Sequence, residues 1–194
     1  SDIQIIAPDD NSPEIGIIDS GIMEEHKYLS FAIINANSKS YVQDDDSKAD
    51  YVLGGGHGTR VAGAVLYPYG VPATGEPYQL PCFVRNLRVL NQDNYLTNKF
   101  PAELMKEIVE DNEDCKVFNL SINASAPHRL KHMSAWAAMI DSLTNEKNIL
   151  FVISAGNLSN QDVRNYLGNG IVYPAFLNEP YCRVANPGQS SFSL

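Results

Sequence analysis

Four short segments of this chain are rich in apolar residues, at residues 14–18, 82–90, 116–122 and 149–153. The segments between them include stretches whose apolar residues recur at helical spacing. A strand buried on both faces needs apolar side chains at most positions, and such strands alternating with helices are typical of βαβ units. The chain is therefore predicted to be an α/β protein with helices on both faces of a mainly parallel sheet.

Three segments show helical spacing of apolar residues, which predicts helices, and the one proline within them, Pro101, suits a first helical turn. The helices are expected at residues 57–66, 100–110 and 129–144, and two further short extended segments at residues 30–34 and 181–185.

Composition narrows the class of protein. The 194 residues are enough for one domain, residues 1–194, with a sizeable core. A net charge of −9 argues against nucleic acid as a partner, because phosphate binding needs a basic surface. No apolar run is long enough to cross a membrane, so no membrane partner is expected. The three cysteines are widely spaced and indicate free thiols, which together with the lack of a signal peptide favours a cytoplasmic location.

A glycine-rich stretch at residues 54–58, Gly-Gly-Gly-His-Gly, leads into the first predicted helix. Glycines let the backbone pass close to other groups, so His57 lies on a slim helix start. A helix N-terminus disfavours a cation, and we therefore expect a neutral, proton-accepting imidazole. The stretch is not a phosphate-binding loop, because it has no lysine before Thr59 and its glycine spacing differs from G-x-G-x-x-G. Taken alone, the motif is also compatible with a structural histidine.

Polar side chains follow two of the predicted strands. Asp19 comes directly after residues 14–18, and Asn157 follows residues 149–153. The carboxyl ends of parallel strands meet at one edge of a sheet, so we expect Asp19, His57 and Asn157 to share that edge. A carboxylate can orient an imidazole, the imidazole can act as a general base, and an amide can donate to an oxyanion. Acyl transfer needs these groups and a nucleophile.

Three motifs contain these residues: Asp19-Ser20-Gly21, His57-Gly58-Thr59-x-Val61-Ala62-Gly63 and Ala155-Gly156-Asn157. Together they resemble the motifs of the subtilisin-like (subtilase) serine peptidases, and the order of Asp before His matches that family. The resemblance covers about residues 14–185. It implies the subtilisin-like doubly wound three-layer fold.

The resemblance also implies a serine endopeptidase that acts on peptide or protein substrates. His57 would be the general base, Asp19 would orient it, and Asn157 would donate to the oxyanion. A cleft strand would pair with the extended substrate, and a pocket would receive the residue before the scissile bond. The strand would consist of Ser121, Ile122, Asn123, Ala124 and Ser125, and the pocket would be lined by Ala155 and Gly156.

The nucleophile of this family lies in a Gly-Thr-Ser-x-Ala signature, which these 194 residues do not contain. Ser154 lies at a predicted strand end, and no Gly-Thr precedes Ser190, Ser191 or Ser193. We therefore interpret the chain as the N-terminal part of a subtilase catalytic domain, truncated before the serine and inactive alone. The alternative is a non-catalytic pseudopeptidase that serves as a peptide-binding or scaffolding module.

No metal or other cofactor is expected for this chemistry. The polar connection at residues 41–50 contains four aspartates, at residues 44–46 and 50. We interpret it as a solvated loop, with calcium binding as the alternative. His128 and His132 have the spacing of metal ligands, but no third ligand is evident. A truncated sheet would leave an edge or an apolar surface open, so self-association is also expected.

Overall fold

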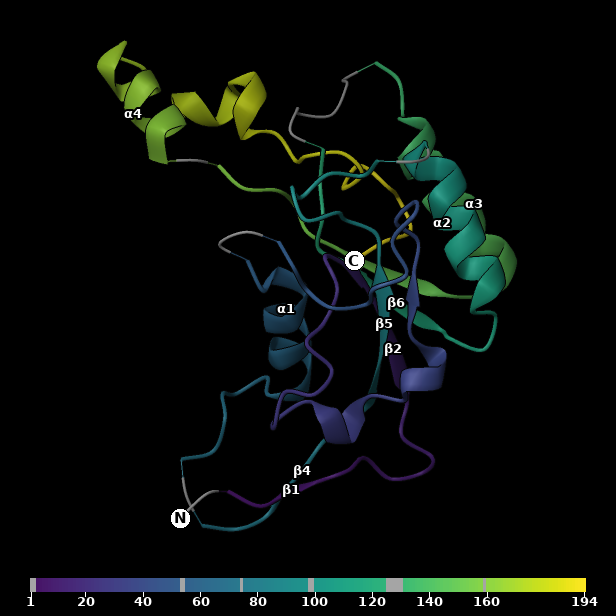
Figure 1. The fold of residues 1–194 in the computed structure, drawn as a ribbon. Coiled ribbons are helices and arrows are strands. Elements are labelled where there is room, and N and C mark those ends of the chain that lie inside the picture. The colour runs from purple at the N-terminus through teal and green to yellow at the C-terminus, as the bar shows by residue number, and fades with distance from the viewer. Residues whose placement is uncertain (1–2, 53–54, 74, 98–99, 125–130, 159) are drawn as a thin grey trace.

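The computed structural model describes residues 3–52, 55–73, 75–97, 100–124, 131–158 and 160–194. At its centre is a parallel sheet of five strands (Figure 1). In spatial order the strands are β3 (Lys39–Ser40), β5 (Phe83–Arg88), β2 (Glu14–Asp19), β6 (Val117–Leu120) and β7 (Leu150–Ile153). A separate parallel pair consists of β1 (Ile5–Ile6) and β4 (Tyr78–Gln79).

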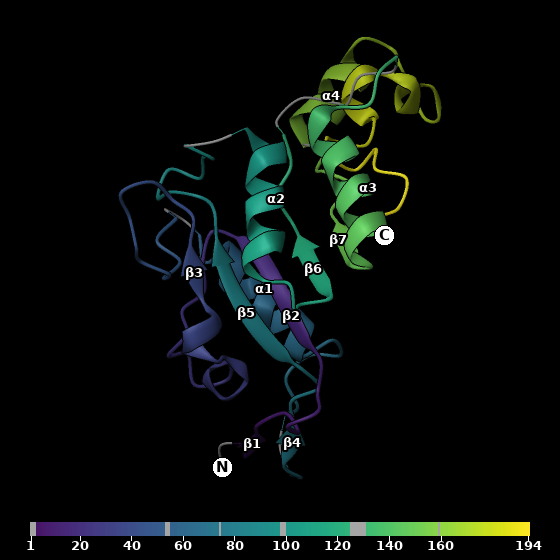
Figure 2. The same cartoon turned by 90° about the vertical axis from the view of Figure 1, so that its right-hand side faces the viewer.

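Helices cover both faces of the sheet, with α1 (His57–Leu66) on one side and α2 (Pro101–Asp111) and α3 (Ala135–Lys147) on the other (Figures 1 and 2). Successive residues of central strand β2 point to opposite faces. Ile17 packs in the core on the α1 side, and Ile18 packs in the core beneath α2 and α3. This arrangement confirms the predicted doubly wound, three-layer α/β fold.

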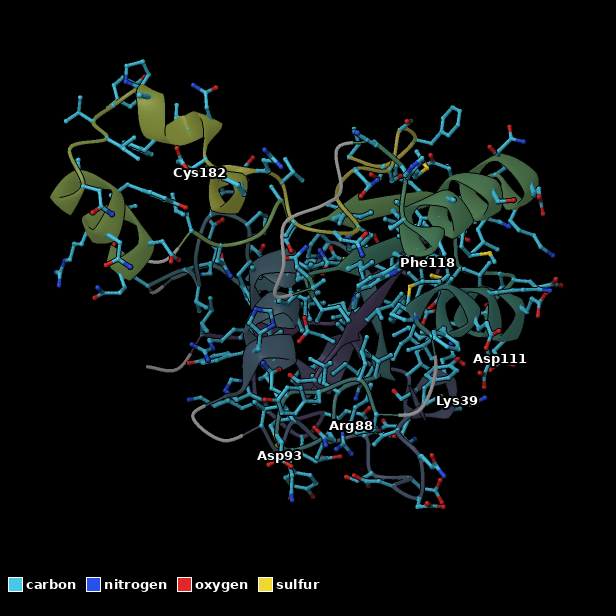
Figure 3. All side chains as sticks on the ribbon, turned by 90° about the horizontal axis from the view of Figure 1, so that it is seen from above. Lys39, Arg88, Asp93, Asp111, Phe118 and Cys182 are labelled. Atoms are coloured by element: carbon cyan, nitrogen blue, oxygen red, sulfur yellow. The ribbon has the colours of Figure 1, made fainter. Side chains whose placement is uncertain are left out.

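Helices α2 and α3 pack on the second face of the sheet and share one buried hydrophobic cluster with β6 and β7. Phe118 of β6 is fully buried there and stacks on Phe151 of β7, with ring centroids 5.4 Å apart (Figure 3). At the sheet edge, Lys39 of β3 forms a 2.6 Å ion pair with Asp111, the last residue of α2 (Figure 3). The strands that carry the candidate site are therefore covered over most of their length.

Two predicted extended segments are wrong. Residues 30–34 contain a 3₁₀ helix, Ser30–Ala32, followed by a single bridge from Ile33 to Val84. Residues 181–185 lie at the end of another 3₁₀ helix, Pro180–Cys182, and Ala185 forms one backbone hydrogen bond to Ala155. Both segments pair with a neighbour at one position only, which is too little for the strand that local composition suggested.

The helix expected at residues 129–144 begins later, at Ala135, and continues to Lys147. Ser134 sets this start, because its hydroxyl accepts a 3.0 Å hydrogen bond from the backbone of Ala137. Residues 129 and 130 lie outside the described residues. The sequence analysis did not predict α4 (Asn160–Gly168), whose only large apolar residues are Val163, Tyr166 and Leu167 and in which no residue is buried.

The segment from α4 to the 3₁₀ helix Ala175–Asn178 projects from the body of the molecule, and Cys182 lies at its end (Figures 1 and 3). We call residues 160–182 the arm.

None of the described helices is long and apolar enough to cross a membrane.

The outer edge of β7 has a further partner. The backbone N–H of Leu194 donates to Phe151, and Ile153 donates to the carbonyl of Leu194, at 3.0 and 2.7 Å. This is the hydrogen-bond pattern of a single parallel bridge between Leu194 and β7. The expected self-association of the chain stays a prediction.

Candidate active site

Asp19 and His57 meet at the carboxyl edge of the sheet. Asp19 is the last residue of β2 and its side chain is 1% exposed, whereas His57 is the first residue of α1 and its side chain is 49% exposed. The imidazole Nδ1 lies 2.8 Å from Asp19 Oδ1 and 2.9 Å from Oδ2. Because Nδ1 is engaged by the carboxylate, Nε2 is the ring nitrogen left to exchange a proton with another group. The half-exposed ring gives such a group access.

Close contact between α1 and the end of β2 produces this geometry. A Cβ atom on Gly58 would lie 2.2 Å from the carbonyl oxygen of Gly21, so only glycine fits at this position. The backbone N–H of Gly58 donates to the hydroxyl of Ser20 at 3.0 Å, and the Ser20 N–H donates to Asp19 Oδ1 at 2.7 Å. The Asp-Ser-Gly and His-Gly motifs are therefore joined by the hydrogen bond from the Gly58 backbone to the Ser20 side chain and by the close approach of Gly58 to Gly21.

Asp19 also affects the protonation equilibrium of the imidazole. Its hydrogen bond with the ring raises the pKa of His57 above the ordinary value, although burial of the ring and the charge of Arg60 act in the opposite direction. The expectation of a neutral His57 was based on the helix N-terminus alone and did not include the contact with Asp19. A carboxylate in direct contact outweighs the partial charge of the helix end.

Asn157 follows β7 and is exposed. Within the described part of the chain, no hydrogen bond joins its side chain to Asp19 or His57. Its neighbour Gly156 has φ +100°, and a Cβ there would lie 2.6 Å from the Cβ of Ala185. The backbone of Ala185 donates to the carbonyl of Ala155 at 2.8 Å. Residues 185–188 therefore pack directly against the predicted substrate pocket.

The predicted cleft strand continues from β6. Asn123 and Ser154 link it to the end of β7 through two side-chain hydrogen bonds, of 2.8 and 2.6 Å. Ile122 is buried, and Ser121 donates to Asn119 at 2.8 Å. The backbone N–H of Ala124 donates to Asn186 at 2.8 Å, and Ser125 lies outside the described residues. The strand is thus close to the predicted pocket residues Ala155 and Gly156.

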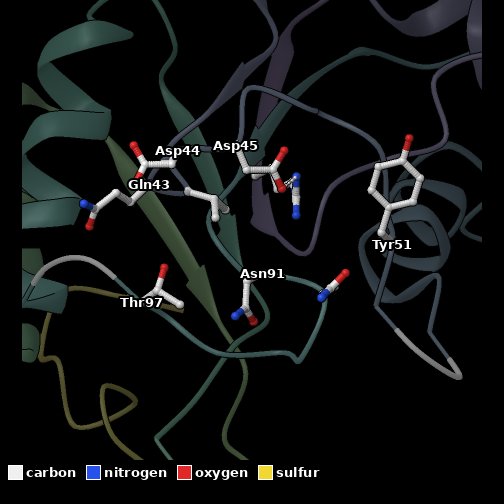
Figure 4. A pocket seen from close by; sticks show the side chains of 9 residues that line it. Gln43, Asp44, Asp45, Tyr51, Asn91 and Thr97 are labelled. Atoms are coloured by element: carbon white, nitrogen blue, oxygen red, sulfur yellow. Dashed lines mark hydrogen bonds and ion pairs between the residues drawn. The ribbon is translucent and has the colours of Figure 1, made fainter.

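A cavity of about 550 Å³ lies at the same edge of the sheet (Figure 4). One of its walls is Arg88, which is the register partner of Asp19 in the neighbouring strand. Arg88 is almost fully buried and donates to Asp45 Oδ2 at 2.8 Å and to the carbonyl of Ser47 at 2.7 Å. Sequence reasoning missed Arg88, although β5 carries three polar residues, Arg85, Asn86 and Arg88, among its apolar ones, which was a signal. The remaining lining residues are Val42, Gln43, Asp44, Asp45, Tyr51, Asn91, Gln92 and Thr97.

The acidic connection is only partly the solvated loop that we predicted. Asp45 pairs with Arg88, and a hydrogen bond from the Ser47 backbone, aided by Arg88, lowers the pKa of the Asp45 carboxyl. Asp50 is buried and accepts hydrogen bonds from Thr59. Among the described residues, no group of three or more His, Cys, Asp or Glu side chains could hold a metal ion. Calcium binding stays a prediction without support from this geometry.

The cysteines are free, as predicted, and two of them are buried. Burial raises the pKa of Cys82 to about 11 and also raises that of Cys115. Neither thiol is therefore poised as a nucleophile for the Asp19–His57 pair.

A doubly wound fold with a histidine held by a buried aspartate at its carboxyl edge matches part of the arrangement found in acyl-transfer hydrolases. The model of the subtilase family matches residues 10–180, and the chain belongs to this family of serine peptidases. None of the curated proteins compared with the chain matches it.

Solved structures of subtilisin-like proteases share the fold. A lanthipeptide protease matches with a TM-score of 0.60 and 18% identity, over 94% of this chain and 47% of that one. A cold-adapted subtilisin-like serine proteinase matches with a TM-score of 0.52 and 21% identity, over 74% and 46%. The epidermin leader peptide processing serine protease of Staphylococcus aureus matches with a TM-score of 0.52 and 17% identity, over 89% and 46%. The chain thus spans about half the length of these structures.

Proposed function

We propose that this chain supplies the general base and its orienting carboxylate to a subtilase centre that hydrolyses peptide bonds. The observation that carries the proposal is the 2.8 Å contact between His57 Nδ1 and the buried carboxylate of Asp19, with the ring half exposed. Family membership supports the same chemistry. The nucleophilic serine would come from sequence outside these 194 residues, because no Gly-Thr-Ser-x-Ala signature is among them.

The proton would move through Nε2 of His57. As the serine oxygen bonds to the substrate carbonyl carbon, Nε2 accepts the hydroxyl proton, and Asp19 stabilises the imidazolium that forms. The carbonyl π-bond opens to an oxyanion. Collapse of this intermediate breaks the C–N bond, and His57 returns the proton to the leaving amine. Water, deprotonated by the same nitrogen, then attacks the acyl-enzyme ester, and as the ester C–O bond breaks His57 returns the proton to the serine oxygen and the acid is released.

The substrate would bind across the ends of β6 and β7. The backbone of residues 121–125 would pair with an extended peptide, and Ala155 and Gly156 would line the pocket for the residue before the scissile bond. Asn157 would donate its amide to the oxyanion, a contribution of about 3 kcal/mol in sites of this kind. Its exposure supports this role, because the side chain is accessible to substrate.

A fluorophosphonate probe tests the proposal, since it phosphonylates only a serine activated by its base. We expect no labelling of the 194-residue chain and strong labelling of a longer protein that contains this chain and the signature serine. In the longer protein, His57→Ala should abolish labelling, and Asp19→Asn should reduce kcat by about 10⁴-fold. Labelling of the 194-residue chain, or undiminished labelling of His57→Ala, would contradict the proposal.

A second candidate that family membership also allows is a non-catalytic peptide-binding module. The same experiment separates the two. A longer protein that binds peptides in the cleft but resists the probe would be a pseudopeptidase.

A further inference from the structure

A second buried carboxylate, that of Asp50, lies near His57. Asp50 is 8% exposed and belongs to the loop that precedes α1. Its Oδ2 accepts two hydrogen bonds from Thr59, one from the backbone N–H and one from the hydroxyl, both of 3.2 Å. Its buried Oδ1 has no hydrogen-bond partner among the described residues. A carboxylate in this state is costly to bury and needs a compensating gain.

The N-terminus of α1 provides such a gain. The residue at the N-cap position is Gly56, with φ +70°, which has no side chain to accept a hydrogen bond from the first turn. Two acceptors from other segments replace it: the Ser20 hydroxyl binds the N–H of Gly58, and the Asp50 carboxylate binds the N–H of Thr59. A negative charge at this end of a helix is also electrostatically favourable. Asp50 thus caps the turn that begins with His57.

The loop that carries Asp50 is itself fixed against the end of β2. The carbonyl of Lys48 accepts hydrogen bonds from the Ile22 backbone at 3.1 Å and from the Asn86 side chain at 2.8 Å. A Cβ on Gly21 would lie 2.7 Å from the carbonyl oxygens of both Lys48 and Ala49, so glycine is needed for this approach. The position of Asp50 is therefore set by the same strand that sets Asp19.

Thr59 completes the connection. Its hydroxyl donates to Asp50 and accepts a 3.0 Å hydrogen bond from the backbone of Met23, just after β2. One threonine thus joins the β2 turn, the Asp50 loop and the first turn of α1.

We propose that Asp50 is a positioning residue for His57: its carboxylate holds the first turn of α1 against the end of β2, and its charge acts on the imidazole. The catalytic consequence rests on the proposed function, but the effect on His57 does not. Three charged groups act on the ring: Asp19 from β2, Arg60 from α1 and Asp50 from the preceding loop. Asp19 has the largest effect and raises the pKa of His57, Arg60 lowers it, and Asp50 raises it.

The test is an NMR titration of the His57 imidazole in the 194-residue chain. Asp50→Asn keeps the size of the side chain and one acceptor oxygen but removes the charge, so the His57 midpoint should move to lower pH. Asp19→Asn should move it further in the same direction. Asp44→Asn is the matched control, because Asp44 lies in the same loop, is exposed and is not among the charged groups that act on the ring. In Asp44→Asn the titration midpoint of His57 should equal that in the unsubstituted chain.

Amide exchange at Thr59 tests the positioning role. Asp50→Ala removes the cap, so the Thr59 N–H should exchange at least about tenfold faster, while Asp50→Asn retains most of the protection. If Asp50→Ala does not fold, Thr59→Val provides the second measurement, because it removes the hydroxyl that bridges Asp50 and Met23. An unchanged His57 midpoint in Asp50→Asn, or unchanged Thr59 exchange in both Asp50→Ala and Thr59→Val, would overturn the proposal.

The pH profile of the longer protein connects this result to catalysis. Asp50→Asn should move the acidic limb of kcat/KM to lower pH, and Asp50→Ala should lower kcat by about tenfold through misplacement of His57. If the longer protein is inactive but the NMR shifts occur, the proposed function fails and the positioning role stands. If activity is present and its acidic limb is unmoved by Asp50→Asn, the positioning role fails alone.

Discussion

The two sides of the candidate site differ in how they are held. On the side of the base, Asp19 and Ser20 are buried, and α1 contacts the end of β2 through backbone atoms. On the side of the predicted oxyanion donor, Asn157 is exposed and leads into the arm, in which neither α4 nor the helix Ala175–Asn178 has a buried residue.

This difference shows that the two halves of the site rely on different sources of order. The strand register and the core fix the base and its carboxylate before any substrate is present. The oxyanion side relies on a few hydrogen bonds of residues 185–188 to the ends of β6 and β7. We therefore expect changes beside α1 to affect stability and geometry, and changes in the arm to leave the Asp19–His57 pair intact.

Leucine truncations on the two sides should give the largest contrast. Leu66 of α1 is fully buried in the core beneath β2, whereas Leu167 of α4 is 48% exposed. We expect Leu66→Ala to lower the free energy of unfolding by about 2–5 kcal/mol, and Leu167→Ala to change it by less than about 0.5 kcal/mol. Urea unfolding followed by circular dichroism measures both. Equal losses would show that the arm packs as tightly as the core.

Glycine substitutions within α1 sharpen the comparison further. The Cβ of Gly58→Ala would collide with the carbonyl of Gly21, whereas a Cβ at Gly63 would meet nothing within 4 Å. Gly58→Ala should destabilise the chain by about 1–3 kcal/mol, because α1 must move away from β2. Gly63→Ala should stabilise it by up to about 1 kcal/mol through helix propensity. Thermal unfolding of both variants tests this, and destabilisation by Gly63→Ala would contradict it.

The sequence predicted the sheet and the base side of the site well. Strands buried on both faces need apolar residues at most positions, so the central strands were visible in composition alone. Asp19 and His57 could be paired because their motifs sit where a strand ends and a helix begins. The family resemblance added their order and roles, and the structure placed Nδ1 within 2.9 Å of both carboxylate oxygens.

The remaining features depend on contacts between distant segments, which local patterns do not encode. Asp50 had the composition of a solvated loop, but it is buried because Gly21, 29 positions earlier, lets that loop approach the end of β2. Arg88 is buried in a strand because Asp45 neutralises it. The arm was missed for a different reason: the apolar face of α4 is only three residues wide, Val163, Tyr166 and Leu167, and none of its residues is buried in the described core.

The smallest expected effect is a pH dependence confined to the base side. Contact with Asp19 raises the folded-state pKa of His57 above its unfolded value of about 6.5. The stabilising contribution of the pair is therefore complete below about pH 6.5 and is lost as pH rises through the folded-state pKa. The difference in unfolding free energy between the unsubstituted chain and His57→Gln should thus be larger at about pH 6 than at about pH 9. Solvent screening of the half-exposed ring keeps this change modest. Asn157→Ala removes no titrating group, so its difference in unfolding free energy from the unsubstituted chain should be the same at both pH values. If this difference changed with pH as much as that of His57→Gln, the distinction between the two sides of the site would be lost.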